Sequence, residues 1–330
     1  MLKNREAYLC LSAMLRAREV KLLSNERCER MLEAPTFEDA AKLLTDCGYE
    51  DMSKMGVKEI EKSLSDHKAE IFHELENIVP DKEILDIFKV KYDYHNAKVI
   101  LKSQSTSSDA DYLLSDSGRI PGVQLKSLYL DEKYSSMPGK LGQAMENAAS
   151  VFSRTTNPQS MDFELDRSYL GEVLDMAKDT GNAFAEGYAK ILIDSANLKA
   201  AVRTMRMGKD NDFLKTVLIK GGDVDPDRIL LCQDKDSLAQ LYAHSVLENA
   251  SVLGGEAIEG GPLTGFELAC DNAVNTYLSN AKLVSYGSEP LTAYLAALES
   301  EITAVRMILT GRLSGVKSEI LKERLRDMYA

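Results

Sequence analysis

Three aspartates are spaced like the first ligands of a calcium-binding loop. Asp223, Asp225 and Asp227 alternate as at the start of a calcium-binding loop, whose carboxylates would surround the ion. Pro226 and Arg228 stand where such a loop needs flexible turn geometry, and its twelfth position carries no Glu. We therefore expect helix capping instead, with Asp225 as the N-cap residue and Pro226 as the first residue of the helix.

A second pair of carboxylates could bridge a metal ion. Asp162 and Asp166 are four residues apart, so they share one face of a helix, as in metal sites built between helices. No His or further Glu pair recurs to complete a coordination shell, and none of the four histidines lies in a zinc-binding H-E-x-x-H pattern. We expect a solvated helix face at these aspartates and no metal site.

The stretch 254–265 is the richest in glycine and could cradle a phosphate. Gly255 and Gly260 have the separation found in a phosphate-binding loop, but Gly261 and Pro262 follow where Lys and Ser or Thr are needed. No Gly-x-Ser-x-Gly elbow and no paired Cys and His signature marks a nucleophile. We expect a plain flexible loop here, and no catalytic or cofactor-binding residues in the chain.

The elements that carry these residues are predicted to be helices. Ile60, Leu64, Ile71 and Leu75 follow a 3.6-residue spacing, and residues 82–102 carry apolar side chains on all sides, as in a helix that is buried almost completely. No segment alternates apolar and polar residues for long enough to predict a strand. Aromatic residues make up 7% of the chain and Trp is absent, which disfavours β-sandwiches and barrels. The predicted fold class is all-α.

Capping residues and breakers predict where helices begin and end. Asn25 is expected to cap a short helix, and Thr36 with Asp39 resembles a capping box at the start of another. Residues 103–109 are polar and rich in Ser, which predicts a loop between two parts of the chain.

Charge and composition restrict the partners of the chain. Its 330 residues carry a formal net charge of −12, so its field repels nucleic acid and anionic lipid surfaces. The longest uncharged stretch, residues 237–247, is too short to span a membrane. Basic residues soon interrupt the N-terminal apolar run, which indicates a helix rather than a signal peptide. The five cysteines form no paired pattern and are expected to be reduced, which fits the cytoplasm.

One helical signature recurs along the chain. An acidic, an amide and a basic residue follow one another at offsets of 0, 3 and 5, and the pattern returns after 101 residues and again, relaxed, after a further 107. The copies are Asp93, Asn96 and Lys98; Asp194, Asn197 and Lys199; and Glu301 and Arg306, with Ala304 in place of the amide. This spacing predicts three related helical units, which we place at residues 1–104, 105–209 and 210–330.

The offsets within each copy determine where its side chains point. Residues three apart share one face of a helix, so the acid and the amide face the same neighbour, whereas the base, two residues after the amide, points about 200° away from it, toward another neighbour. Polar groups in a mostly buried helix need hydrogen-bond partners, most simply on an adjacent helix. We therefore interpret the signature as structural.

The run at residues 91–102, KYDYHNAKVILK, resembles the first-repeat hallmark of the C-subunit family of V/A-type ATP synthases, which is related to the d subunit of the eukaryotic V-ATPase. Residues 197–203, 294–306 and 323–329 resemble later parts of the same family, and residues 13–23 resemble its opening helix. These segments follow one another in the expected order along almost the whole chain.

This resemblance implies a funnel-shaped, all-helical protein of three related units around a pseudo-threefold axis. One copy per complex would sit between the membrane rotor ring and the soluble central stalk, at the cytoplasmic face of the membrane and without inserting into it. The family has no catalytic residues and no cofactor to carry over. Its function is mechanical, because it accepts the stalk in a socket and transmits torque that couples ATP synthesis or hydrolysis to ion transport.

Five basic residues are candidates for contact with these partners. They are Arg16, Arg18, Lys21, Arg324 and Arg326. For each of them, pairing within the chain or exposure to solvent is the first expectation and contact with a partner is the second.

Two other functions fit an acidic all-α chain. An enzyme could use its aspartates and Mg²⁺ to act on a phosphorylated small molecule, although the carboxylates lack matched motifs on facing helices. The other alternative is a helical scaffold unrelated to rotary ATPases. Association with stalk subunits and a rotor ring, or with Mg²⁺ and a small molecule, distinguishes these functions.

Overall fold

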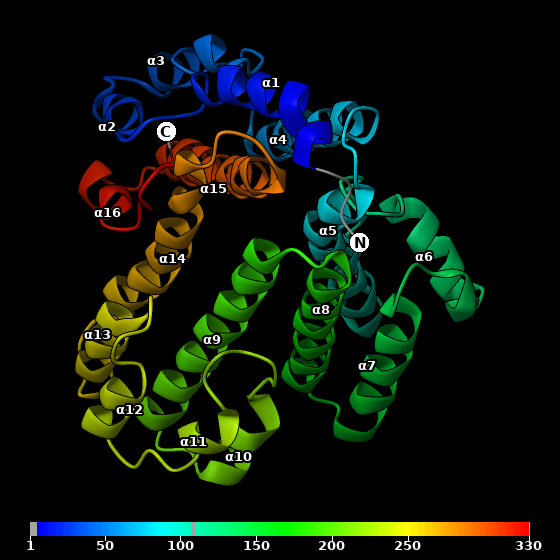
Figure 1. Cartoon of the computed structure of the whole chain (residues 1–330), viewed down its shortest axis with the longest axis vertical. Helices are drawn as coiled ribbons and strands as arrows, with labels where there is room; N and C mark the ends of the chain where they lie inside the picture. The colour runs from blue at the N-terminus through cyan, green and yellow to red at the C-terminus, as the bar shows by residue number, and fades with distance from the viewer. Residues whose placement is uncertain (1–4, 107–109, 330) are drawn as a thin grey trace. The chain divides into compact units, whose positions relative to one another are not determined.

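The computed structural model of the chain is all-helical (Figure 1), which confirms the predicted fold class. It describes residues 5–106 and 110–329, and the regular elements of these residues are α-helices and short 3₁₀ helices. The contacts within the described residues divide them into two compact units, residues 68–189 and residues 5–67 with 190–329. The boundaries between the units fall inside α4 (Val57–Glu76) and α9 (Ala183–Arg206).

Residues 68–189 are organised around one buried helix. The side chains of Ile84, Leu85 and Val90 in α5 (Lys82–Thr106) point to different sides of the helix and are all buried, because α5 is apolar all round. The helices that contact it include α6 (Gly122–Leu130), α7 (Leu141–Thr155) and α8 (Pro158–Thr180). The loop predicted at 103–109 is wrong over its first half, since residues 103–106 continue α5, and residues 107–109 lie outside the described residues.

A second buried helix, α9, organises the stretch that follows it. In the other unit, Leu198 and Val202 of α9 pack in one core with Tyr242 and Phe266. The helices around this core are α10 (Asn211–Val217), α11 (Pro226–Ile229), α12 (Lys235–Leu241), α13 (Glu248–Ile258) and α14 (Leu263–Ser279). Figure 1 shows α12, α13 and α14 following one another beside α9.

The glycine-rich stretch at 254–265 is not the flexible loop that the sequence predicts. α13 continues to Ile258 and α14 begins at Leu263, so only the residues between them form a loop. A Cβ atom on Gly254 would lie 2.7 Å from Cγ2 of Val202 and 3.1 Å from Cε2 of Phe266. Gly254 therefore sits inside a helix because its neighbours come too close for any side chain.

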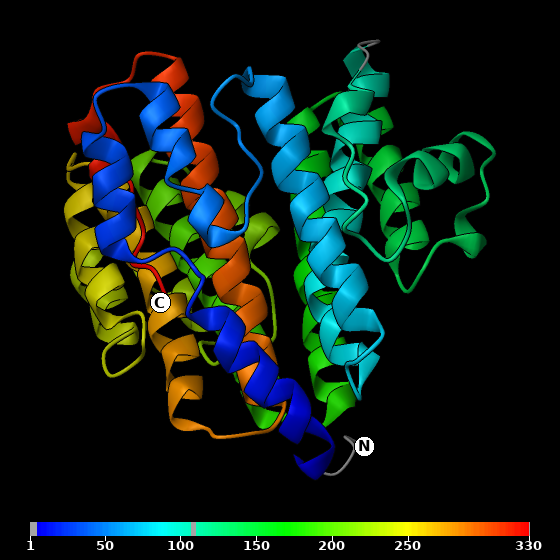
Figure 2. The same ribbon diagram turned by 90° about the horizontal axis from the view of Figure 1, so that it is seen from above.

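The two ends of the chain build the rest of this unit together. α15 (Ser288–Leu313) is buried on most sides and contacts α1, α2, α3 and α16 (Figures 1 and 2). These helices are α1 (Leu9–Glu19), α2 (Asn25–Glu33), α3 (Phe37–Lys42) and α16 (Ser318–Lys322). Arg312 donates hydrogen bonds to the carbonyl oxygens of Leu32 and Ala34, at 2.7 and 2.6 Å, and so satisfies the C-terminal end of α2.

Most of the predicted caps are present, and one is displaced by a residue. Thr36 accepts a hydrogen bond from the backbone N–H of Asp39 at 3.1 Å, and Asp225 caps α11 as expected. Ser24, rather than Asn25, caps α2. The Asn25 side chain instead accepts a hydrogen bond from the backbone N–H of Met328, and so ties the C-terminal tail to α2.

Candidate functional site

The first signature copy lies on α5 and holds the loop that precedes α6. Asp93 accepts hydrogen bonds from the backbone N–H of Arg119 at 2.9 Å and from its Nε at 2.6 Å. Asn96 makes two bonds of 2.8 Å with the backbone of Ser115: its Nδ2 donates to the carbonyl oxygen, and its Oδ1 accepts from the N–H. Both side chains are fully buried, so loop 115–119 is fixed to α5 from its two ends.

The second copy repeats this arrangement on α9. Asp194 accepts hydrogen bonds from the backbone N–H groups of Asp223 at 3.0 Å and Val224 at 3.2 Å. Asn197 again makes two bonds of 2.8 Å to the backbone of one residue, Ile219, by donating to its carbonyl oxygen and accepting from its N–H. We call this arrangement of helix acid, helix amide and held loop a loop anchor.

Each loop anchor contains a glycine that the sequence reasoning missed. Gly118 precedes Arg119 and Gly222 precedes Asp223, so both stand directly before a residue whose N–H bonds the helix acid. A Cβ atom on either glycine would collide with the carboxylate of Asp93 or Asp194. The matched position of a glycine in the two loops is the signal that could have revealed the partners of the two acids.

The third copy, on α15, lacks the amide, and its acid binds one backbone N–H group and one hydroxyl. Glu301 accepts hydrogen bonds from the backbone N–H of Leu23 and from the hydroxyl of Tyr49, the latter at 2.6 Å. Leu23 lies in the segment that precedes α2. The loop held here therefore comes from the N-terminal part of the chain, and Ala304 offers it no hydrogen bond.

The bases of the three copies bind other elements, as their direction on the helix predicts. Lys98 pairs with Asp166 of α8 at 2.5 Å, and Lys199 pairs with Asp271 of α14 at 2.7 Å. Each aspartate stands eight residues after the first residue of its helix. The third base pairs with α4: Arg306 Nε lies 2.7 Å from Glu61 Oε2. The acid and the amide, in contrast, bind loops rather than the adjacent helix that we expected.

The solvated face predicted at Asp162 and Asp166 is an ion-paired face in the structure. Asp166 bonds Lys98, and Asp162, one helical turn before Asp166 on α8, lies 2.9 Å from Lys102, one turn after Lys98 on α5. The two pairs join α8 to α5. Among the described residues, no cluster of three or more His, Cys, Asp and Glu side chains could hold a metal ion.

Burial raises the pKa of all three signature acids. The pKa of Asp93 rises through desolvation, against which the Arg119 guanidinium acts. Among the described residues, the donors that bond the Asp194 carboxylate are backbone N–H groups, and burial raises its pKa to about 6. Burial also raises the pKa of Glu301, although the Tyr49 hydroxyl donates to it. The acids are therefore buried at an energetic cost that their loop contacts offset, which is the behaviour of structural groups.

Two of the predicted partner-contact residues are bound within the chain. Arg16 Nη2 donates to the carbonyl oxygens of Ala281 at 2.6 Å and Val284 at 2.8 Å, and Nη1 bonds Glu19. Arg326 forms an ion pair with Asp271 at 2.6 Å. Both arginines are therefore paired within the chain.

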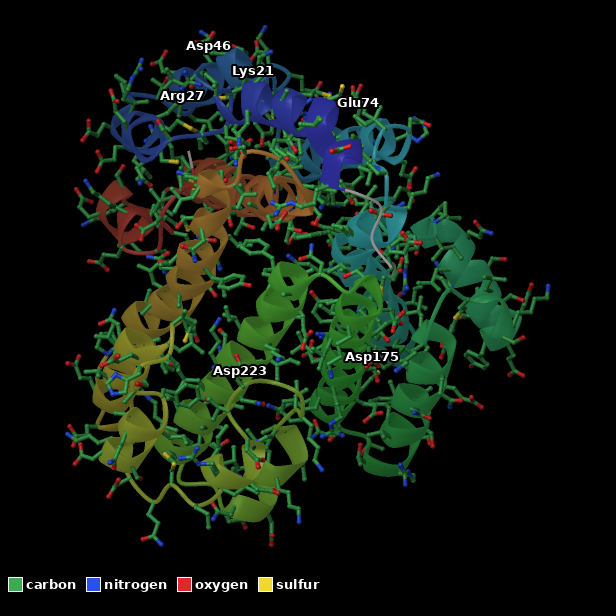
Figure 3. All side chains as sticks on the ribbon, in the orientation of Figure 1. Lys21, Arg27, Asp46, Glu74, Asp175 and Asp223 are labelled. Atoms are coloured by element: carbon green, nitrogen blue, oxygen red, sulfur yellow. The ribbon has the colours of Figure 1, made fainter. Side chains whose placement is uncertain are left out.

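The other three predicted contact residues reach solvent. Arg18 is half-buried, whereas Lys21 and Arg324 are exposed. The side chains of Lys21 (Figure 3) and Arg324 make no hydrogen bond or ion pair with any residue that the structure describes. These two cations remain available for contact with a partner.

A cavity of about 520 Å³ is lined by the residues on either side of Lys21, and of its basic side chains only Arg16 was predicted as a candidate for partner contact. It is bordered by α1, the start of α2, the 3₁₀ helix η5 (Asn280–Leu283) and the C-terminal tail. The side chains that matter for its charge are Arg16, Glu19, Arg27 and Lys282. The Lys282 ammonium lies over the ring of Tyr329, 4.5 Å from its centre. No motif marks these residues, because they come from the two ends of the chain.

Within the described residues, none of the helices has the length and apolar composition of a membrane span.

The chain is matched over residues 11–324 by the model of a family described as ATP synthase (C/AC39) subunit. It is 25% identical to the C subunit of the V-type sodium ATPase of Enterococcus hirae, over 97% of this chain and 98% of that protein. It is 24% identical to the C subunit of the A-type ATP synthase of Methanocaldococcus jannaschii, over 96% and 86%, and 23% identical to that of Halobacterium salinarum, over 96% and 97%.

Proposed function

Because the chain belongs to the ATP synthase (C/AC39) subunit family, we propose that it joins the soluble central stalk of a V/A-type rotary ATPase to the membrane rotor ring. As a subunit of such a complex it is a structural rather than a catalytic component. Family membership sets aside the Mg²⁺-dependent enzyme and the unrelated scaffold that the sequence left open.

The proposed task is to accept the stalk in a socket and transmit torque, which couples ATP synthesis or hydrolysis to ion transport. The loop anchors are the observation that supports it. In two copies, a buried acid and a buried amide each bind the backbone of the loop. In the third copy, the acid alone binds the backbone of the held segment. Loops held in this way deform little, and densely packed helices have low compressibility. A torque-transmitting subunit needs both properties.

We further propose that the chain has three related units, each headed by its signature helix. The first would contain α5–α8 and the second α9–α14, because Lys98 and Lys199 pair with α8 and α14. The third would contain α15, α16 and the N-terminal helices α1–α4, because Glu301 and Arg306 bind residues there. This division differs from residues 1–104, 105–209 and 210–330 by giving both chain ends to one unit. A funnel shape with a pseudo-threefold axis remains part of the proposal.

The proposed location is the cytoplasmic face of the membrane, with one copy held there by the other subunits. The net charge of −12 favours attachment through proteins over attachment to anionic lipid. The names of the relatives, a V-type sodium ATPase and A-type ATP synthases, support the same kind of complex for this chain.

Co-purification tests this function. An affinity-tagged copy of the full chain, expressed in its own cells and isolated in mild detergent, should bring down both the stalk subunits and the rotor ring. The control is an unrelated tagged protein treated in the same way. If the tagged chain brings down neither, or if it turns over a phosphorylated small molecule with Mg²⁺, the proposal is wrong.

A further inference from the structure

The cavity beside α1 has more positive charge than its own carboxylates neutralise. Arg16 is paired with Glu19. In contrast, Arg27, Lys282 and the adjoining Lys21 form no ion pair with a carboxylate anywhere in residues 5–106 and 110–329. Arg27 donates to the Cys47 thiol at 2.6 Å, and carboxylates influence it only from longer range.

Two exposed apolar residues lie in segments that border the same cavity: Val20 lines it, and Leu283 follows the lining residue Lys282. Leu283 and Val20 are 88% and 85% exposed, the highest values among the large apolar side chains that the structure describes. Arg16 binds the carbonyl oxygens of the residues on either side of the Lys282–Leu283 pair, so this segment lies beside α1. Val20 lines the cavity one helical turn after Arg16. Apolar contact area therefore adjoins the unneutralised cations.

The walls of this cavity are fixed before any partner binds. The C-terminal tail is tied to α2 by the bond from Met328 N–H to Asn25, and to α14 by the bond from Asp327 N–H to Asn272 at 3.1 Å. Arg16 of α1 binds the segment that carries Lys282 and so fixes this part of the lining to α1. A preformed site loses little conformational freedom on binding, which favours affinity.

We propose that this cavity docks an acidic segment of a central-stalk subunit that also carries apolar side chains. The proposal rests on the proposed function and names the surface that would perform it. Carboxylates of the segment pair with Lys21, Arg27 and Lys282, and its apolar side chains cover Val20 and Leu283. Elsewhere the field of a chain with net charge −12 repels such a segment, so the basic cavity also directs the encounter.

The stalk fits this cavity better than the rotor ring does. A ring offers the same surface repeatedly around its axis, so docking to it requires several equivalent contacts. One asymmetric cavity with a fixed arrangement of cations suits a single inserted segment. A cavity facing the membrane would also attract anionic headgroups, which would compete with an acidic protein segment for the same lysines.

The test compares the affinity of the full-length chain for purified stalk subunits before and after charge reversal. The double variant Lys21→Glu with Lys282→Glu should bind the stalk roughly tenfold more weakly, with a slower association rate and a weaker dependence on salt. The matched control is Lys209→Glu with Lys220→Glu, two exposed lysines without an ion pair in the described structure. The control should bind within about twofold of the wild type.

A second variant tests the apolar part without changing the charge. Leu283→Ser should weaken stalk binding about three- to tenfold through lost apolar contact. Its control is Leu231→Ser, because Leu231 is 78% exposed and neither it nor its chain neighbours line the cavity. The melting temperatures of all variants should match the wild type, since each substituted side chain is exposed.

The outcomes separate this proposal from the proposed function. If the wild-type chain binds neither stalk nor detergent-solubilised ring, the proposed function fails. If the wild type binds the stalk and both cavity variants bind it equally well, the function stands and the docking site is wrong. Loss of ring binding with unchanged stalk binding would also overturn the proposal, because the stalk would then not be the occupant.

Discussion

At the scale of residues, two asparagines in the loop anchors act through the loop backbone. The side chains of Asn96 and Asn197 are fully buried, which is costly unless their polar groups are paired. Each takes both the N–H and the carbonyl oxygen of one loop residue, as a neighbouring strand would. The amide therefore removes a burial cost on both sides at once: its own, and that of a loop backbone buried against the helix.

Replacing this amide should destabilise the protein. We expect Asn197→Leu to lower the free energy of unfolding by about 1–3 kcal/mol, because the buried N–H and carbonyl of Ile219 lose their partners. Urea denaturation followed by circular dichroism measures the change. The control is Asn249→Leu on α13, an exposed position, which should stay within about 0.5 kcal/mol of the wild type. An unchanged denaturation curve for Asn197→Leu would contradict the anchoring role.

Asp194 should make stability depend on pH in a distinctive direction. Its pKa is raised to about 6 by burial, so the folded chain binds a proton that the unfolded chain has already released. Stability from this group is fully present below its unfolded pKa, near 3.8, and is lost as the pH rises through 6. Between pH 4 and pH 7, the unfolding free energy of the wild type should therefore fall relative to that of Asp194→Asn. Parallel profiles across that range would show that Asp194 titrates normally.

The sequence was sufficient to identify the polar residues of the signature. It did not show which residues they bind. The polar signature was recognisable because an acid, an amide and a base stand out in an apolar helix. The partners of Asn96 and Asn197 lie 19 and 22 residues away and offer backbone atoms, which every residue has. Arg16 likewise binds two carbonyl oxygens, 265 and 268 residues away. One sequence alone contains no sign of such pairings.

At the scale of elements, the long helices work because they are apolar on all sides. α5 and α15 are buried along most of their length, and their buried polar side chains, such as Asp93, Asn96 and Glu301, bind neighbouring segments. Because residues 82–102 carry apolar side chains on all sides of the helix, the sequence alone predicted that α5 is buried. The sequence did not predict that the glycine-rich residues at the end of α13 would be helical. Whether a helix contains a glycine at a given position depends on which residues pack against that position.

Substitution of Gly254 tests whether its neighbours exclude a side chain at this helix position. Alanine usually stabilises a helix relative to glycine by about 1 kcal/mol. We expect Gly254→Ala instead to lower the free energy of unfolding by about 1–3 kcal/mol, because the new methyl group overlaps Val202 and Phe266. Thermal and urea denaturation give the value.

The matched control is Gly171→Ala on α8, where nothing lies within 4 Å of the added Cβ atom. That substitution should leave stability unchanged or raise it slightly. If both variants are equally stable, α13 does not pack as closely on α9 and α14 as the structure indicates.

At the scale of the whole molecule, the chain ends matter more than their position in the sequence suggests. The third signature helix, α15, takes the partners of its acid and its base from the N-terminal region, at Leu23, Tyr49 and Glu61. Linear spacing predicted the three helices, but it could not assign an N-terminal segment to the last of them. The same convergence of the two ends forms the basic cavity proposed as the stalk-docking site.

The central claim is that this chain connects the rotation of the stalk to ion movement. The most direct measurement is ATP-driven uptake of H⁺ or Na⁺ by proteoliposomes that contain the complete complex, the complex depleted of this chain, or the depleted complex with the chain restored. We predict that depletion abolishes uptake while ATP hydrolysis by the catalytic head continues, and that restoring the chain recovers uptake. Undiminished uptake by the depleted complex would contradict the claim.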